Sequence, residues 1–384
     1  MNPAAAPSSA TGVRAASRSA APYRIMVVDD SAVIRGLLTR SLEADPDLNV
    51  VASVGDGQMA LNALRRQNIE IVILDIEMPV MDGLTALPKI IAAKPGIQVL
   101  IASTLTLRGA TVSMKALSLG AADYVTKPGS SALTTASEFK RDLVGKVKGL
   151  AQARRQARGE AMPGPLSARP GEPAPAPATV PRAADIHLRP LPTDKPDVVA
   201  IGSSTGGPQA LFRLLKSLVG VKQPLLITQH MPATFTTILA EHIVRLTGLA
   251  AAEAVDGEPI LGSRVYIAPG DYHILAEAQG AERRLRLSKS APENFCRPSV
   301  DPMLRSLAQV YGRRVLCAIL TGMGSDGLRG GEALVAAGAA VVAQDEKTSI
   351  VWGMPGAVAM AGLCSAVLPI DELGPFILRI TGRA

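Results

Sequence analysis

The residues of this chain best suited to chemistry lie in a glycine-rich turn, within the stretch VVAIGSSTGGP at residues 198–208. Its first four residues are apolar and typical of a buried parallel strand, and Pro208 suits the first turn of a helix. The letters GSSTG fit the spacing G-x-S-x-G, in which glycines let the backbone turn sharply and expose one hydroxyl above the sheet edge. This spacing favours Ser204 over Ser203 as a nucleophile. A phosphate-binding loop is the alternative, because backbone amides at a helix N-terminus bind anions.

A histidine and a carboxylate follow two further apolar runs, which predict strands of the same sheet. Residues 225–228 lead to His230, and residues 315–320 lead to Asp326 in the sequence TGMGSD. Because parallel strands end at one sheet edge, we expect the hydroxyl, imidazole and carboxylate to converge as nucleophile, general base and orienting group. Alternatively, His230 is a packing residue and Asp326 accepts backbone amides. The order Ser, His, Asp along the chain differs from that of the α/β-hydrolases.

The remaining histidines and the cysteines have plainer interpretations. We expect His187 to be solvated, His242 to lie on a helix surface or to pack, and His273 to be a weaker candidate for lining the cleft. The three cysteines are far apart and form no C-x-x-C pair, which predicts buried thiols rather than a zinc site or a disulfide. They are Cys296, Cys317 and Cys364.

The first third of the chain carries a second set of chemical groups, again placed where predicted strands end. Asp29 and Asp30 follow the first apolar run, Asp75 the third, Ser103 the fourth and Lys127 the fifth. Three carboxylates at one sheet edge repel one another unless a divalent cation neutralises them, and a compact oxygen-rich site suits Mg²⁺. Solvent-facing loops would explain any one of these residues, but not their placement after four strands of one sheet.

Short apolar runs that alternate with helical stretches must position both sets of groups. This alternation predicts a doubly wound parallel sheet before the proline-rich middle of the chain and a second one after it. The predicted strands are Ile25–Val28, Val50–Val54, Ile71–Leu74, Val99–Ala102 and Tyr124–Val125 in the first sheet, and Val198–Ile201, Leu225–Thr228, Val315–Leu320 and Ala340–Ala343 in the second.

The chain of 384 residues therefore divides into two α/β domains, a linker and an extension. Residues 1–21 are mostly Ala, Ser and Pro, which predicts a disordered segment. The first domain is expected at 22–148 and the second at 197–384. Residues 149–196 are rich in Pro and Ala, so we expect a semi-extended linker that keeps the domains near each other. A hydrophobic content of 47% is ample for two cores.

The net charge of +7 raises the question of nucleic-acid binding. The excess lies in residues 1–21, with 2 basic and no acidic residues, and in residues 140–195, with 11 and 5. Both predicted domains are nearly neutral, and aromatic residues make up only 3%, which disfavours a base-stacking surface. No apolar run is long enough to span a membrane, and a signal-peptide core is absent. We expect a cytoplasmic protein that binds no nucleic acid and does not insert into membranes.

The first domain resembles the receiver domains of two-component systems, which have a flavodoxin-like fold. The resemblance lies in VVDDS at residues 27–31, LDIEMP at 74–79 followed by MDG, and VTKP at 125–128. It implies that Asp75 accepts a phosphoryl group from a sensor histidine kinase. The implied Mg²⁺ ligands are Asp29, Asp30, Asp75 and the backbone of Glu77, and the implied switch residues are Ser103 and Lys127.

The second domain resembles the catalytic domain of the chemotaxis protein-glutamate methylesterases. Its motifs are IGSSTGG, TQHMP, YIAPG, RPSVD and LTGMGSDG, which begin at residues 201, 228, 266, 297 and 320. Members of this family hydrolyse glutamate methyl esters on chemoreceptors and release methanol, and many also deamidate receptor glutamines. No cofactor is implied for ester hydrolysis.

The same resemblance implies a role for each residue of the predicted catalytic site. Ser204 would be the nucleophile, His230 the base and Asp326 its partner. The backbone amide of Met323 would stabilise the oxyanion, and Thr205 would lie beside these groups. This chain departs from the family at the position before the nucleophile, where Ser203 replaces a common alanine.

Two functions remain open from the sequence. The first is an esterase controlled by aspartyl phosphorylation, whose unphosphorylated receiver covers the catalytic site. The second is a response regulator with a non-catalytic output domain that binds a nucleotide or a partner through the glycine-rich turn. A serine-directed phosphonate would separate them, because labelling needs an activated hydroxyl.

Overall fold

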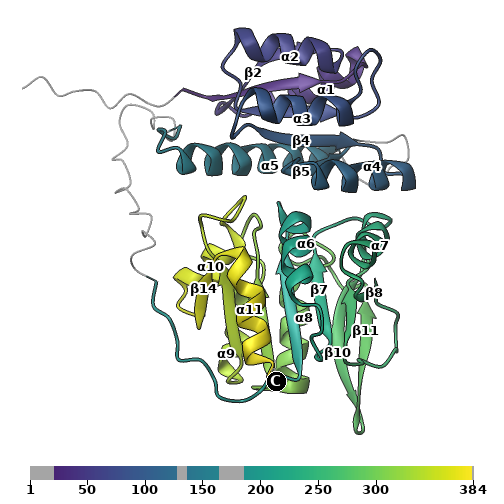
Figure 1. Cartoon of the computed structure of the whole chain (residues 1–384), viewed down its shortest axis with the longest axis vertical. Helices are drawn as coiled ribbons and strands as arrows, with labels where there is room; N and C mark the ends of the chain where they lie inside the picture. The colour runs from purple at the N-terminus through teal and green to yellow at the C-terminus, as the bar shows by residue number, and fades with distance from the viewer. Residues whose placement is uncertain (1–20, 128–135, 164–185, 383–384) are drawn as a thin grey trace, which may run out of the picture.

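The computed structural model describes residues 21–127, 136–163 and 186–382, which form two α/β domains (Figure 1). The first domain has a parallel five-stranded sheet in the order β2-β1-β3-β4-β5, the flavodoxin-like order. Its strands are β1 (Tyr23–Val28), β2 (Leu48–Val54), β3 (Ile71–Asp75), β4 (Gln98–Ser103) and β5 (Asp123–Thr126). Its helices are α1 (Ala32–Glu43), α2 (Gly57–Arg66), α3 (Gly83–Ala93), α4 (Leu107–Ser118) and α5 (Ala136–Ala157).

Local sequence explains where the elements of this domain begin. All five residues of β3 are buried, as expected for a continuous apolar run covered by helices on both faces. Ser31, Asp56, Asp82 and Thr106 each cap a helix, because the side-chain oxygen accepts a hydrogen bond from a backbone amide of the first turn. The five predicted strands of this sheet are all present.

The second domain has a larger sheet of seven parallel strands in the order β14-β13-β12-β6-β7-β9-β8. Its strands are β6 (Val198–Ser203), β7 (Leu225–Gln229), β8 (Ala250–Glu253), β9 (Arg264–Ile267), β12 (Val315–Ile319), β13 (Ala340–Gln344) and β14 (Ala366–Leu368), and the antiparallel hairpin is β10 (His273–Gln279) with β11 (Glu282–Ser288). Its helices are α6 (Gly207–Ser217), α7 (Phe235–Thr247), α8 (Val300–Tyr311), α9 (Leu328–Ala336), α10 (Met354–Met360) and α11 (Ile370–Ile380).

The four predicted strands of this sheet are β6, β7, β12 and β13, which are four consecutive neighbours in the order β13-β12-β6-β7. The strands that the sequence patterns missed are the edge strands β14 and β8, the strand β9 next to β8, and the hairpin strands β10 and β11. They are short or half-exposed: β14 has three residues and β8 is AAAE with no fully buried residue. Such strands lack the apolar run that marks a central parallel strand.

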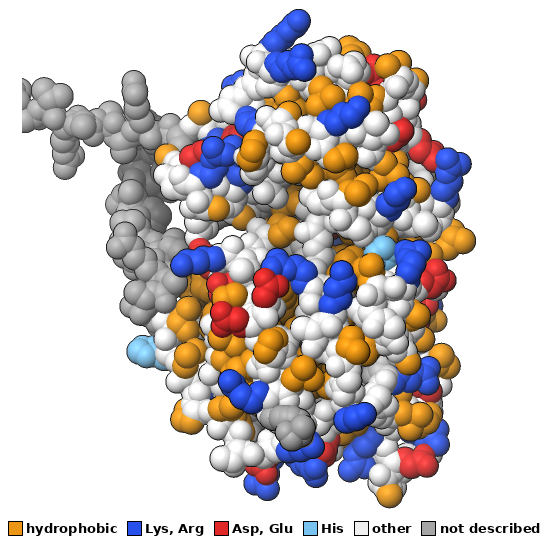
Figure 2. All heavy atoms as spheres, in the orientation of Figure 1, with side chains coloured by type: hydrophobic (Ala, Val, Ile, Leu, Met, Phe, Trp, Pro, Cys, Tyr) orange, Lys and Arg blue, Asp and Glu red, His pale blue; other side chains and the backbone are white. Residues whose placement is uncertain are grey.

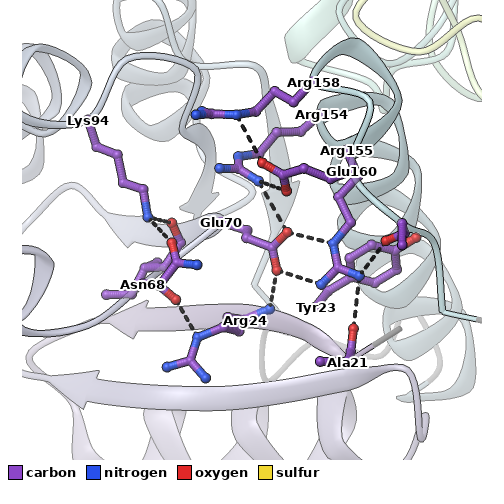
Figure 3. A network of polar contacts seen from close by, with 12 residues as sticks. Ala21, Tyr23, Arg24, Asn68, Glu70, Lys94, Arg154, Arg155, Arg158 and Glu160 are labelled. Carbon is purple, nitrogen blue, oxygen red and sulfur yellow. Dashed lines mark hydrogen bonds and ion pairs between the residues drawn. The ribbon is translucent and has the colours of Figure 1, made fainter. Parts of the chain in front are cut away.

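The predicted domain boundary at residue 148 falls inside α5, which continues to Ala157. The last turns of this helix are held by a buried ion-pair network around Glu70 (Figure 3). Arg155 Nε lies 2.7 Å from Glu70 Oε1 and Arg155 Nη2 lies 2.9 Å from Oε2, and Arg154 adds a contact of 3.1 Å. Burial alone would raise the pKa of Glu70, but Arg155 and a backbone amide outweigh it and lower this pKa.

The same arginine joins the two ends of the first domain. Arg155 Nη1 donates to the carbonyl oxygen of Ala21 at 2.8 Å (Figure 3). Its Nη2 donates to the carbonyl oxygen of Pro22 at 3.1 Å. The residue range 21–22 leads directly into β1, so the start of the domain and the end of α5 lie at one corner.

The second sheet points its carboxyl edge at the first domain. Residues 186–196 run along the side of the second domain to its far end, where β6 begins, so β6 and its parallel neighbours run back toward the first domain (Figure 1). The domains meet along a seam (Figure 2). Across it Tyr124 stacks on Phe235 with ring centroids 4.4 Å apart. Ser118 Oγ lies 3.0 Å from His242 Nε2. Among the described residues, no helix is both long and apolar enough to cross a membrane.

Candidate active site

The glycine-rich turn between β6 and α6 is tight and packed on all sides. Gly206 has a φ of 76°, in the left-handed region that favours glycine. A Cβ at Gly207 would lie 1.9 Å from Gln229 Oε1, so no side chain fits there. The Ser204 amide donates to Thr321 O at 3.0 Å, which joins the turn to the loop after β12.

The two serines of the turn point to different surroundings. Ser203 is fully buried and donates its hydroxyl to Gln229 Oε1 at 2.6 Å. Gln229 Nε2 in turn donates to the carbonyl oxygen of Ser204 at 3.0 Å, which fixes the backbone of the turn. Ser204 lines a cavity at the carboxyl edge of the sheet, and Ser203 does not. The extra hydroxyl of Ser203 thus has a structural partner of its own.

His230 and Asp326 meet at this edge, as their positions after β7 and β12 predict. His230 Nε2 lies 2.7 Å from Asp326 Oδ2. The carboxylate also accepts the backbone amides of Val300 at 2.6 Å and Asp301 at 3.0 Å, and the Ser299 hydroxyl at 2.8 Å. Burial would raise the pKa of Asp326, but His230 and these donors lower it to about 2. Asp326 is therefore a fixed anion at the N-terminus of α8.

Asn294 makes a further contact that the sequence did not reveal. Its Nδ2 donates to Asp326 Oδ1 at 2.8 Å and to Asp301 Oδ2 at 3.0 Å, so one amide bridges two carboxylates. Both Asn294 and Ser299 lie in or just before the motif RPSVD. The motif singled out this part of the sequence, but it lies between predicted helices and strands. No sequence pattern there indicates that the Asn294 and Ser299 side chains donate hydrogen bonds to Asp326.

The second ring nitrogen of His230 contacts a sulfur. Cys296 Sγ lies 3.4 Å from His230 Nδ1, and Cys296 is partly exposed, so the prediction that all three cysteines are buried is wrong for this one. The loop after β11 brings it to the cavity instead of the core. Burial would lower the pKa of His230, but Cys296 and Asp326 outweigh it and raise this pKa to about 10. Within the described residues, Ser204 Oγ makes no hydrogen bond to His230.

The cavity over these residues has a volume of about 370 Å³ and is shared by both domains. The second domain contributes Ser204, Thr205, His230, Cys296, Met323 and Asp326, and the first contributes Asp123, Tyr124, Thr126, Asp142 and Lys146. Thr205 is almost fully buried, and its Oγ1 has no hydrogen-bond partner among the described residues. The first domain thus covers the carboxyl edge that carries Ser204.

The Met323 loop forms the side of the cavity nearest to α5. Gly145 and Gly149 of α5 face the Met323 side chain, and a Cβ at Gly145 would lie 2.9 Å from Met323 Cε. The Met323 backbone amide donates to no acceptor within the described residues, so it is free to meet a ligand oxygen.

The other histidines lie outside the cavity. His273 is fully buried and accepts the Ser299 amide on Nδ1 at 3.1 Å, so it supports the Asp326 loop and does not line the cleft as predicted. Its strand position, at the start of β10, faces the core. His242 is buried and packs on Phe212 at 4.7 Å between ring centroids, which fits the packing interpretation. His187 is exposed, as expected.

The acidic residues of the first domain also converge. One carboxylate oxygen from each of Asp29, Asp30 and Asp75 lies within 4.8 Å of the other two. Lys127 Nζ reaches into this cluster, 2.6 Å from Asp29 Oδ2 and 2.8 Å from Asp75 Oδ1. Burial raises the pKa of Asp75 and outweighs the opposing effect of Lys127. Anionic oxygens in this arrangement are the donors that Mg²⁺ prefers, so the residues fit a magnesium site.

Two further predicted residues border this acidic cluster. Ser103 and Glu77 line the same cavity as Asp75, with a volume of about 460 Å³. Ser103 Oγ donates to Gly109 O at 3.1 Å. The Glu77 carboxylate turns outward to pair with Arg108 at 2.9 Å, which leaves only its backbone for a metal ion.

Comparison with known proteins relates both halves of the chain to one class of protein. Residues 199–377 match the CheB methylesterase family, and residues 25–137 match the response regulator receiver domain. The chain is 57% identical over 384 residues to the protein-glutamate methylesterase/protein-glutamine glutaminase of group 2 operon of Rhodospirillum centenum, covering 97% of this chain and 98% of the relative. It is 58% identical over 372 residues to the protein-glutamate methylesterase/protein-glutamine glutaminase of Azospirillum brasilense, covering 94% of each chain.

A solved structure resembles part of the chain. The Thermotoga maritima CheB methylesterase catalytic domain is 37% identical, with a TM-score of 0.47, and the match covers 48% of this chain and 99% of that one.

Proposed function

Because this chain belongs to the protein-glutamate methylesterase/protein-glutamine glutaminase family, we propose that it hydrolyses glutamate methyl esters on chemoreceptors under the control of aspartyl phosphorylation. Methanol and glutamate are the products, and receptor glutamines are a second substrate. We propose that this reaction takes place in the cytoplasm. The non-catalytic alternative is not favoured, because it leaves the ordered His230 and Asp326 pair without a role.

The reaction begins at Ser204, whose hydroxyl attacks the γ-carbonyl carbon of the ester. The neutral form of His230 takes the hydroxyl proton on Nδ1, since Nε2 is engaged by Asp326 at 2.7 Å. The raised pKa of His230 makes this form the minor one at neutral pH and a stronger base than an ordinary imidazole. The imidazolium then protonates the departing methoxide oxygen, which leaves as methanol, and water releases glutamate from Ser204 by the same steps. Asp326 stays ionised throughout, because α8 amides and the Ser299 hydroxyl hold its charge.

Negative charge develops on the carbonyl oxygen in each tetrahedral intermediate. The Met323 amide and the Thr205 hydroxyl both border the cavity, and neither has an acceptor among the described residues. We assign them to this oxygen. One such donor is typically worth about 10²–10³ in kcat.

Asp75 is the proposed phospho-acceptor, with a sensor histidine kinase as the phosphodonor. The Mg²⁺ ion would be held by Asp29, Asp30, Asp75 and the Glu77 backbone, and it would supply charge neutralisation for phosphoryl transfer. Lys127 already spans two of these carboxylates and would meet the phosphoryl oxygens. The Ser103 hydroxyl, now on Gly109 O, would turn to the phosphoryl group.

The receiver controls the esterase by covering it. We propose that Ser204 is closed off from a receptor while the first domain supplies one wall of its cavity. Phosphorylation rearranges the residues around Asp75 and weakens the contact of β5 and α5 with the second domain. A change of about 5.5 kcal/mol is enough to move such an equilibrium from 1:99 to 99:1.

The observation that carries the catalytic proposal is the 2.7 Å contact of His230 with Asp326 beside Ser204 in one cavity. Its test is methanol release from methyl-labelled receptor membranes, with a serine-directed phosphonate as a second probe. We expect phosphonate on Ser204 and methanol release that rises with a phosphodonor. The proposal would be contradicted if no methanol were released with or without the phosphodonor and no serine were labelled by the phosphonate.

A further inference from the structure

Cys296 has a reactive neighbour that neither of the other cysteines has. Its sulfur contacts His230 Nδ1 at 3.4 Å, and His230 contacts the Asp326 carboxylate through its other nitrogen. The three side chains form a thiol, imidazole and carboxylate series of the kind that activates a cysteine. Ser204 needs the same nitrogen, so the thiol and the hydroxyl compete for one base.

The sulfur is also placed where a small molecule can meet it. Cys296 is partly exposed and lines the 370 Å³ cavity, whereas Cys317 and Cys364 are fully buried. Thr205, 1% exposed, also lines that cavity, and its Oγ1 has no hydrogen-bond partner in the described parts of the chain, which marks the space as one that receives a polar ligand.

We propose that Cys296 is a modification site at which peroxides and alkylating electrophiles react with the thiol and switch the esterase off. The site is defined by the sulfur, by His230 as its base and by the cavity that admits the reagent. The loss of activity rests on the proposed function, whereas modification of the sulfur does not.

The chemistry needs only the oxidant or electrophile as a co-reactant. The thiol proton passes to His230 Nδ1, and the sulfur attacks one oxygen of hydrogen peroxide. The O–O bond breaks, the departing hydroxide takes the proton from His230 to give water, and a sulfenic acid remains on Cys296. With iodoacetamide an S–C bond forms and iodide leaves. Either product fills the space beside Nδ1 and keeps the Ser204 hydroxyl from reaching its base.

The first experiment measures the reactivity of the Cys296 sulfur and does not depend on esterase activity. The full-length protein is treated with iodoacetamide at pH 7, and alkylation of each cysteine is followed by peptide mass. We expect Cys296 to react while Cys317 and Cys364 stay protected. In the His230→Gln variant the rate at Cys296 should fall about tenfold or more, because the thiolate is the nucleophile and a thiol without a neighbouring base is mostly protonated at pH 7. An unchanged rate in that variant would overturn the assignment of His230 as base.

The second experiment links the sulfur to activity. Hydrogen peroxide should abolish methanol release by the wild type in step with sulfenic acid at Cys296, and a thiol reductant should restore it. The Cys296→Ala variant, compared with its own untreated sample, should keep its activity. Full modification of Cys296 with undiminished release would refute the switch. If untreated wild type releases no methanol, the proposed function fails, and the alkylation rates still decide the modification site.

Discussion

Met323 of the catalytic loop rests against Gly145 of α5, so closely that a Cβ at Gly145 would lie 2.9 Å from Met323 Cε. The residue whose amide is assigned to the oxyanion therefore touches the receiver directly. Gly149, one turn later, is less crowded, because a Cβ there would lie 3.7 Å from Met323 Sδ, an ordinary contact. This difference offers a disruptive substitution at Gly145 and a mild one at Gly149 of the same helix.

Gly145→Leu should weaken the closed arrangement and raise basal methanol release. Overpacking of this kind costs about 1–3 kcal/mol, and 1.4 kcal/mol corresponds to about tenfold in an equilibrium constant. We expect an increase of roughly tenfold without phosphodonor and little further stimulation with it. Gly149→Ala is the control and should behave as the wild type. Equal basal rates in all three proteins would show that this contact does not restrain the enzyme.

A fragment that begins at Pro196 should be more active than the unphosphorylated full-length protein, because it lacks the wall that β5 and α5 supply. A phosphodonor should not accelerate it. The two proteins are compared at equal concentration with and without phosphodonor. A slower fragment would mean that the receiver contributes to catalysis or to receptor docking.

Ser204→Ala should lower kcat by about 10⁶, the typical cost of losing the nucleophile of a triad. Ser203→Ala should keep most of the activity, because its hydroxyl bonds Gln229 at 2.6 Å and does not line the cavity. The latter change should cost about 1 kcal/mol of stability, since one buried hydrogen bond is lost. The reverse pattern of activities would reassign the nucleophile to Ser203.

Asp75→Asn should abolish phosphorylation by acetyl phosphate, because an amide is a poor nucleophile and a weaker Mg²⁺ ligand than a carboxylate. Basal methanol release should persist. Phosphate incorporation is measured with and without Mg²⁺, and incorporation at the wild-type level would remove Asp75 from this role.

Glu70→Gln should change how the stability of the receiver depends on pH. The pKa of Glu70 is lowered in the folded state from an ordinary value of 4.5. The ion pairs of Glu70 therefore contribute fully to the stability of the folded receiver above pH 4.5, and this contribution is lost as the pH falls through the lower pKa of the folded state. The variant should be about 3–5 kcal/mol less stable at pH 7, and this gap should narrow on acidification below pH 4.5. Denaturant melts of both proteins at several pH values measure it. A gap that is constant with pH would show that charge at Glu70 is unimportant.

The sequence predicts most of the fold because central parallel strands are continuous apolar runs. It also predicts that Ser204, His230 and Asp326 share an edge, since each follows such a run. The edge strand β14 was not predicted, because its three residues are too few to form a recognisable apolar run. The contact of Cys296 with His230 could not be foreseen, because it depends on the path of the loop after β11, and no periodic pattern describes a loop. The domain boundary predicted at residue 148 was wrong because the end of α5 is tied to the first domain by a distant partner, Glu70, which no local pattern reveals.

The corner where Arg155 binds the carbonyl oxygens of Ala21 and Pro22 has a topological consequence. The first strand of the receiver begins at this corner and its last helix ends there, so the two ends of the domain lie side by side. A receiver with its ends joined at this corner, and with new termini opened in a distant loop, should therefore fold.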